Sequence, residues 1–187
     1  MAEAIRILAV AGSQRAGSLN KKLVRLGAEA LTRLGASVDL LDLREVVMPC
    51  YDGDDEAASG LPPGAVAFKA RLARAQGVLI ASPEYNNSIP GTFKNAIDWA
   101  SRGDDDVFTG KVAALMSASP GGVGGMRALP HLRQVLTALG VWLIPGQVTV
   151  AKAHEAFDDA GRFKADFLQK QVDSLAATLL DTVRRFA

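Results

Sequence analysis

Short apolar runs alternate along this chain with longer segments in which apolar residues recur every three or four positions. The short runs predict buried strands, and they cover residues 5–11, 38–41, 77–82, 111–119 and 141–150. The longer segments predict amphipathic helices, and they cover residues 19–34, 64–76, 92–101, 127–139 and 163–186. Within the last strand, Pro145 and Gly146 mark a point where the strand can be interrupted.

The helical spacing also predicts which side chains are buried. The first helix is expected to bury Leu23, Leu26, Ala30 and Leu34. The last helix is expected to bury Phe167, Leu168, Val172, Leu175, Leu179 and Val183. Phe93 and Trp99, on the third helix, are expected in the core. Residues 48–64, "MPCYDGDDEAASGLPPG", are rich in glycine, proline and acid and predict a long loop.

The alternation of five strands with five helices predicts a single α/β domain over residues 1–187. Parallel strands need helical crossovers, so we expect a five-stranded parallel sheet with helices on both faces, in three layers. In sheets of this kind, ligands bind beyond the carboxyl ends of the strands. Three loops fall at such ends, at residues 12–20, 83–91 and 119–125, and they are expected to share one site.

Charge and cysteine content narrow the class of function. The chain has 21 Lys and Arg against 20 Asp and Glu, so no charge excess favours nucleic acid or an anionic membrane as a partner. Its single cysteine, Cys50, excludes an intrachain disulfide and is expected to fill a loop or core position. The N-terminus lacks the pattern of a signal peptide, and no run of about 18 apolar residues predicts a membrane span. We therefore expect a cytoplasmic location.

The histidines give little support for acid–base or metal chemistry. There are two, and His131 is expected to be a structural helix residue, while His154 has no readable partner. Because only one cysteine accompanies them, no metal site is expected. The chain also has no G-x-S-x-G sequence of a serine hydrolase.

The first loop, "GSQRAGSLN", has the composition of an anion site. Free N–H groups at a helix N-terminus favour an anion, and Arg15 can bind a phosphate through paired hydrogen bonds. The dinucleotide pattern would need glycine in place of Gln14, and a triphosphate loop would need lysine and a hydroxyl in place of Ser18 and Leu19. A monophosphate is therefore the best fit. In the alternative interpretation, Ser18 only caps the helix and Arg15 is a solvated surface charge.

The other two loops supply groups that suit the edge of a flat heterocycle. In "SPEYNNSIPG", Pro83 and Pro90 stiffen a polar turn at the end of a buried strand. In "SASPGGVGG", four glycines allow the backbone to approach a ligand closely. The same glycines are equally well explained by backbone geometry alone.

With "PCYDGD", "PEYNNSIPGTFKNAIDW" and "SASPGGVGGMRALPHLRQVL" added to the first loop, the chain resembles the NADPH-dependent FMN reductase family. This family has a flavodoxin-like fold and includes bacterial quinone and chromate reductases. The likeness runs from about residue 5 to the last helix. It implies bound FMN, with NADPH or NADH as reductant. It implies a phosphate site at Ser13, Arg15, Ser18, Leu19 and Asn20, and a ring site at Pro83, Glu84, Tyr85, Asn86, Ser117, Ser119, Gly121 and Gly122.

The resemblance also implies a ping-pong reaction. Hydride passes from NAD(P)H to the flavin, and the electrons then pass to a quinone, with chromate, ferric chelates and azo dyes as further acceptors. No catalytic side chain is expected, because the flavin carries the hydride. A homodimer through the helix at 92–101 is implied. A homotetramer stays open, because Arg127 matches a tetramer contact of the chromate-reducing members whereas its partner positions hold Pro130 and Val148.

Two other functions stay open on the sequence. One is a flavodoxin-like electron carrier without its own NAD(P)H activity, although carriers of this kind tend to be strongly acidic and this chain is not. The other is a protein that binds a sugar phosphate or a nucleotide without a flavin.

Overall fold

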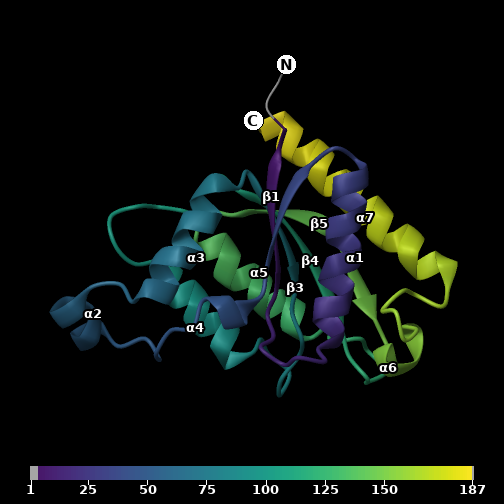
Figure 1. The fold of residues 1–187 in the computed structure, drawn as a ribbon, viewed down its shortest axis with the longest axis horizontal. Helices are drawn as coiled ribbons and strands as arrows, with labels where there is room; N and C mark the ends of the chain where they lie inside the picture. The colour runs from purple at the N-terminus through teal and green to yellow at the C-terminus, as the bar shows by residue number, and fades with distance from the viewer. Residues whose placement is uncertain (1–3, 187) are drawn as a thin grey trace.

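Five strands form one parallel sheet in the computed structural model, which describes residues 4–186. They are β1 (Arg6–Ala11), β2 (Ser37–Leu41), β3 (Gly77–Ala81), β4 (Val112–Ala118) and β5 (Trp142–Val150). Their order across the sheet is β2-β1-β3-β4-β5, and every neighbouring pair is parallel (Figure 1). This confirms the expected α/β sheet, and it places the carboxyl ends of β1, β3 and β4 side by side.

Helices cover both faces of the sheet and complete the three layers (Figure 1). On one face lie α1 (Leu19–Arg33) and α7 (Asp166–Phe186), and on the other lie α3 (Pro63–Arg74), α4 (Gly91–Ala100) and α5 (Ala128–Ala138). The buried side chains form two clusters, one between each helical layer and the sheet. Each helix therefore buries one face against the strands, as its apolar spacing predicts.

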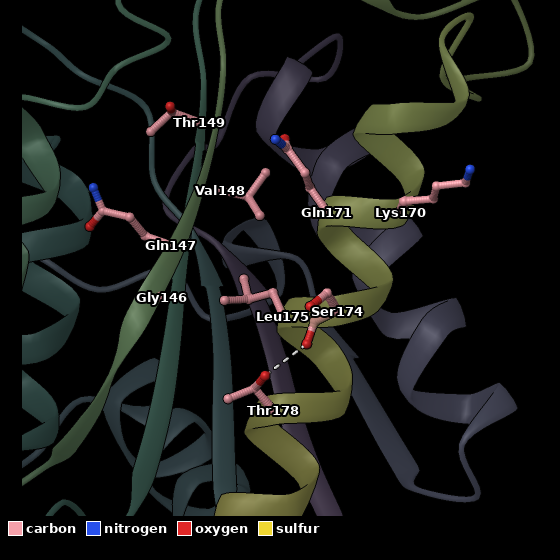
Figure 2. A pocket seen from close by; sticks show the side chains of 9 residues that line it. All are labelled: Gly146, Gln147, Val148, Thr149, Lys170, Gln171, Ser174, Leu175 and Thr178. Atoms are coloured by element: carbon pink, nitrogen blue, oxygen red, sulfur yellow. Dashed lines mark hydrogen bonds between the residues drawn. The ribbon is translucent and has the colours of Figure 1, made fainter.

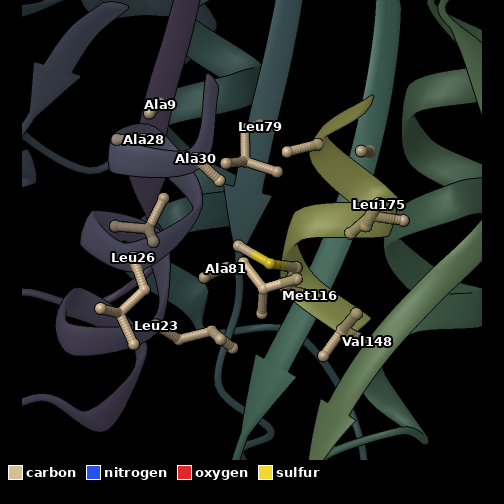
Figure 3. Packing of buried hydrophobic residues seen from close by; sticks show 14 of the residues in the cluster. Ala9, Leu23, Leu26, Ala28, Ala30, Leu79, Ala81, Met116, Val148 and Leu175 are labelled. Carbon is tan, nitrogen blue, oxygen red and sulfur yellow. The ribbon is translucent and has the colours of Figure 1, made fainter. Parts of the chain in front are cut away.

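The core under α1 and α7 is closely packed. Leu23 and Leu26 of α1 face Leu79 and Met116 of the sheet, and Leu175 approaches from α7 (Figure 3). A Cβ added at Gly27 would lie 2.6 Å from the Leu79 side chain and 3.1 Å from that of Met116, so a larger residue there would have to displace these core side chains. Phe93 and Trp99 are buried under the opposite layer, as expected.

Two residues predicted in the core lie at the surface. Leu34 is 42% exposed because α1 ends at Arg33 and Leu34 is only its C-cap. Phe167 is 61% exposed because the buried stripe of α7 begins one position later, at Leu168, about 100° further round the helix. The other members of both predicted sets are buried.

Two short helical elements lie in or just before the segment predicted as a long loop. These are the 3₁₀ turn η1 (Leu43–Glu45), just before it, and α2 (Gly53–Ser59) within it. Asp52 starts α2 by accepting a hydrogen bond from the Asp54 N–H at 2.8 Å, and acidic residues fill the first turn, where the helix dipole favours them. No residue of α2 is buried, so apolar spacing gave no sign of it.

The end of the chain also differs from the prediction in detail. A short helix, α6 (Ala153–Ala156), follows β5, and α7 begins at Asp166 instead of residue 163. Phe163 instead pairs with Phe157 in an isolated β-bridge, their rings stacked 4.8 Å apart. Strand β5 does not break at Pro145 and Gly146 but bulges there, and β5 lies at the sheet edge, where proline is tolerated. Among residues 4–186, no helix has the length and apolar character needed to cross a bilayer.

Candidate cofactor site

The three predicted loops meet at the carboxyl edge of the sheet. Asn20 links the first loop to the third: its amide nitrogen donates to the Ala118 carbonyl at 2.8 Å, and its amide oxygen accepts the Ala118 N–H at 2.9 Å. The side chain is buried, so these bonds are shielded from water. Asn20 therefore fixes the start of α1 against the end of β4. The sequence predicted a role for Asn20 at a phosphate, and it did not predict this pairing across 98 residues.

The first loop presents hydrogen-bond donors with no partner of their own. Ser18 is the N-cap of α1, but its hydroxyl makes no capping hydrogen bond. The N–H groups of Leu19 and Asn20 have no acceptor in the part of the chain that the structure describes. Ser13 is buried and accepts the Arg15 N–H at 3.3 Å, while the Arg15 side chain is exposed. Free donors at a helix N-terminus are suited to an anion.

The second loop contains a tight hairpin. Tyr85 and Ser88 exchange two backbone hydrogen bonds of 2.9 and 3.0 Å, and between them Asn86 and Asn87 have φ of 50° and 63°. Two successive left-handed residues are the geometry of a type I′ turn, which favours asparagine and glycine. The two asparagines are therefore explained by the backbone conformation of the turn, which was not predicted from the sequence. Asparagine tolerates left-handed backbone better than most residues, so the pair could have indicated this turn. Tyr85 is 46% exposed.

The third loop packs around an unpaired hydroxyl. Ser117 is fully buried, and its Oγ has no hydrogen-bond partner among the described residues. A Cβ added at Gly125, where φ is +80°, would lie 2.1 Å from that oxygen. Gly125 is therefore required by backbone geometry and close packing. Gly122 differs, because a Cβ there would meet nothing within 4 Å, which leaves open space beside the backbone.

Glu84 joins the second loop to the third. Its side chain, only 12% exposed, accepts the Arg127 N–H at 2.9 Å, and its other oxygen lies 3.6 Å from the Arg127 guanidinium. The carboxylate is thus held at the N-terminus of α5, where the helix dipole favours negative charge. The sequence identified Glu84 as a site residue without showing this partner.

A loop after β2 forms the rim beside these three. The Pro49 carbonyl accepts from Asn95 Nδ2 at 2.7 Å and from Trp99 Nε1 at 2.9 Å, and Asn95 Oδ1 accepts the Tyr51 N–H at 2.8 Å. Asn95 and Trp99 lie one turn apart on α4, so the spacing of the two residues could have revealed the pair. A hollow of about 230 Å³ lies between this rim and the first loop; its lining includes Gln14, Met48, Cys50 and Thr92.

Another cavity, of about 470 Å³, lies apart from the loops. It runs between the middle of β5 and α7, and its lining includes Gln147, Lys170, Gln171 and Thr178 (Figure 2). None of the predicted site residues lines it. No group of three or more His, Cys, Asp or Glu side chains within residues 4–186 is arranged to hold a metal ion.

Comparison with known proteins gives the family. A sequence model of the NADPH-dependent FMN reductase family matches residues 5–155. The chain is 39% identical over 186 residues to an NAD(P)H-dependent FMN reductase of Pseudomonas aeruginosa, covering 99% of this chain and 98% of the relative. It is 38% identical over 185 residues to a 2-hydroxy-1,4-benzoquinone reductase of a Burkholderia species, covering 95% and 98%.

A solved structure agrees with this assignment. FerB, a flavoenzyme NAD(P)H:(acceptor) oxidoreductase from Paracoccus denitrificans, superposes with a TM-score of 0.82 at 29% identity, covering 97% of this chain and 98% of FerB. The family match spans the three loops described above. The chain therefore belongs to the NADPH-dependent FMN reductase family, and it is an oxidoreductase with FMN as its cofactor and NAD(P)H as its reductant.

Proposed function

We propose that this protein transfers hydride from NAD(P)H to FMN held at the three loops, and then passes the electrons to a quinone. The observation that carries the proposal is the unpaired donor set at the start of α1, which lies at the same sheet edge as the 85–88 hairpin. The Burkholderia relative, a 2-hydroxy-1,4-benzoquinone reductase, supports a quinone as acceptor, and the Pseudomonas relative, an FMN reductase, supports a flavin.

The first loop fits the FMN phosphate. Ser13, Arg15 and Ser18 supply two hydroxyls and a guanidinium, and the Leu19 and Asn20 N–H groups point along the helix dipole. The loop has no lysine in the place where a triphosphate loop needs one. Because the Asn20 amide is paired with Ala118, we assign Asn20 to the phosphate through its backbone N–H only.

The second and third loops fit the ring system. Tyr85 and Asn86 lie exposed in a tight turn that follows the buried Pro83, and Glu84 contributes backbone only, because its carboxylate is paired with Arg127. On the other side lie Ser117, Ser119, Gly121 and Gly122. The unpaired Ser117 hydroxyl and the open space at Gly122 suit a ligand beside this loop.

When bound, FMN supplies the hydride-accepting ring and the electrons for the acceptor. The protein would orient it, and backbone N–H groups beside the ring would favour negative charge there, as an oxyanion hole does. No side chain is assigned a proton transfer. The apolar hollow beside the first loop gives a flat quinone a place to approach, and chromate, ferric chelates and azo dyes are further acceptors to compare.

Steady-state kinetics of the purified FMN-loaded protein test this proposal. NADPH and NADH are each varied against 1,4-benzoquinone, with chromate, a ferric chelate and an azo dye as comparison acceptors. Parallel double-reciprocal lines with the quinone are expected for a ping-pong reaction. Bound FMN that neither nicotinamide reduces would instead indicate an electron carrier, and failure to bind FMN would indicate a flavin-independent binding protein.

A further inference from the structure

We propose that Arg127 and His131, at the start of α5, are positioning residues that hold the 84–88 hairpin in place for FMN. This inference rests on the proposed role of the hairpin in binding the flavin ring. It gives the expected structural role of His131 a specific partner, Ser88, and it assigns Arg127 to contacts within the chain.

Arg127 holds the hairpin at two points. Its backbone N–H donates to Glu84 at 2.9 Å, and its guanidinium donates to Asn87 Oδ1 at 3.2 Å. The same guanidinium lies 3.6 Å from the Glu84 carboxylate. One residue thus contacts both the residue before the hairpin bridge and the tip of the turn.

His131 holds the opposite strand of the hairpin. Its Nδ1 lies 2.9 Å from the Ser88 hydroxyl, within hydrogen-bond distance. Residues four apart on a helix lie on the same side, so Arg127 and His131 present one continuous contact surface at the start of α5. Glu84, Asn87 and Ser88 are the hairpin residues held in this way, which leaves Tyr85 and Asn86 without a side-chain hydrogen bond from α5.

The backbone pairing within the hairpin is short. Tyr85 and Ser88 form a single isolated bridge, and an isolated two-stranded hairpin is marginally stable in water. Below it, Gly125 separates Ser117 from Glu84, with an added Cβ 2.1 Å from the Ser117 oxygen and 3.6 Å from the Glu84 Cβ. Weakening the contacts between Arg127 and Glu84 would therefore let the turn move relative to Ser117, on the other side of the same site.

The contacts are too exposed to contribute much to folding. Arg127 is 59% exposed, and exposed ion pairs contribute little to the stability of a fold. Loss of the contacts should therefore change the position of the hairpin while leaving the melting temperature of the protein nearly unchanged. This separates a positioning role from a purely structural one.

The test compares Arg127→Ala, His131→Ala and the double variant with the wild type. Arg127→Ala removes the guanidinium contacts to Asn87 and Glu84 and keeps the backbone N–H bond to Glu84. Arg133→Ala is the matched control, because Arg133 lies on the same helix but bonds to the Ile144 and Pro145 carbonyls, away from the hairpin. Two quantities are measured: hydrogen exchange of the Tyr85 and Ser88 amides in the apoprotein, and the Kd for FMN by quenching of flavin fluorescence. His131→Asn, whose amide can occupy the place of Nδ1, is the conservative rescue.

We expect each single alanine variant to raise both the amide exchange rate and the FMN Kd about three-fold, and the double variant about ten-fold. Arg133→Ala should change neither, and His131→Asn should restore the wild-type values. Unchanged amide exchange in the double variant would overturn the proposed hold on the hairpin, whether or not FMN binds. Faster exchange with an unchanged FMN Kd would overturn its role toward the flavin. Failure of the wild type to bind FMN would instead contradict the proposed function.

Discussion

At the scale of single residues, the site contains side chains that hydrogen-bond to other parts of the protein and side chains that make no such bond. Asn20 and Glu84 use their side chains to join loops, with Ala118 and Arg127 as their partners. Arg15 and Ser18 form no side-chain hydrogen bond with any described residue. Because unpaired donors bind a ligand without first losing a partner, the second group is the better source of binding energy for FMN.

Arg15→Ala should weaken FMN binding, because it removes charge-assisted hydrogen bonds to the phosphate. Such bonds contribute about 1.5–3 kcal/mol, so the Kd should rise roughly ten- to a hundred-fold. Fluorescence titration of the apoprotein measures it. Arg25→Ala is the control, since Arg25 is an exposed arginine further along α1. Equal Kd values for both variants and the wild type would count against the phosphate assignment.

At the scale of elements, two turns depend on particular residues. The hairpin at 85–88 needs left-handed backbone at Asn86 and Asn87. The turn before β4 is held by Asp106, whose Oδ1 accepts the N–H groups of Phe108 at 2.9 Å and Thr109 at 3.0 Å. Both depend on short polar side chains that can adopt or support such turns.

Asn86→Gly should preserve the hairpin, whereas Asn86→Val should destabilise it. Glycine adopts φ of 50° without strain, while a β-branched residue is disfavoured there by about 1–2 kcal/mol. Urea unfolding and FMN titration of the two variants give the comparison. The valine variant should lose flavin affinity and the glycine variant should keep it. Equal behaviour would mean that the turn does not depend on this backbone conformation.

The Asp106 carboxyl is expected to contribute to the free energy of unfolding in a pH-dependent way. The Thr109 hydroxyl, together with the N–H groups of Thr109 and Phe108, lowers the pKa of Asp106 from 3.8 to about 2. A carboxyl whose pKa is lowered by folding stabilises the protein above its unfolded pKa, and the effect is lost as the pH falls toward 2. Asp106→Asn should therefore be less stable than the wild type at pH 7, by less than about 1 kcal/mol because the group is exposed.

Urea unfolding of both proteins between pH 2 and pH 7 measures the difference. The difference in the free energy of unfolding between the wild type and Asp106→Asn should become smaller as the pH falls below about 4. A gap that stays constant across this range would show that the Asp106 carboxylate contributes nothing to the turn.

At the scale of the whole molecule, most of the architecture follows from apolar periodicity. All five strands and the five longer helices were predicted, because buried strands and amphipathic helices leave clear patterns. Helix α2 was missed because it buries nothing, and Phe167 was misplaced because neighbouring apolar residues on a helix can face different ways. The homodimer through α4 and the cytoplasmic location stay predictions.

The loops at the sheet edge were located correctly for the same reason: strand order alone brings them together. Their internal contacts were not predictable. The Asn20–Ala118 and Glu84–Arg127 pairs join residues 98 and 43 positions apart, and no local pattern encodes such partners. The turn at Asn86 and Asn87 is different: it was missed, but it could have been predicted, because a type I′ turn depends on residues adjacent in the chain.

The central claim is that FMN bound at these loops is reduced by NAD(P)H and reoxidised by a quinone. Anaerobic stopped-flow absorbance of the FMN-loaded protein tests it most directly, with 1,4-benzoquinone added after NADPH or NADH. The account predicts bleaching of the flavin absorbance by at least one nicotinamide and its return when the quinone is added. A bound flavin that neither nicotinamide bleaches, or that stays reduced in the presence of the quinone, would contradict it.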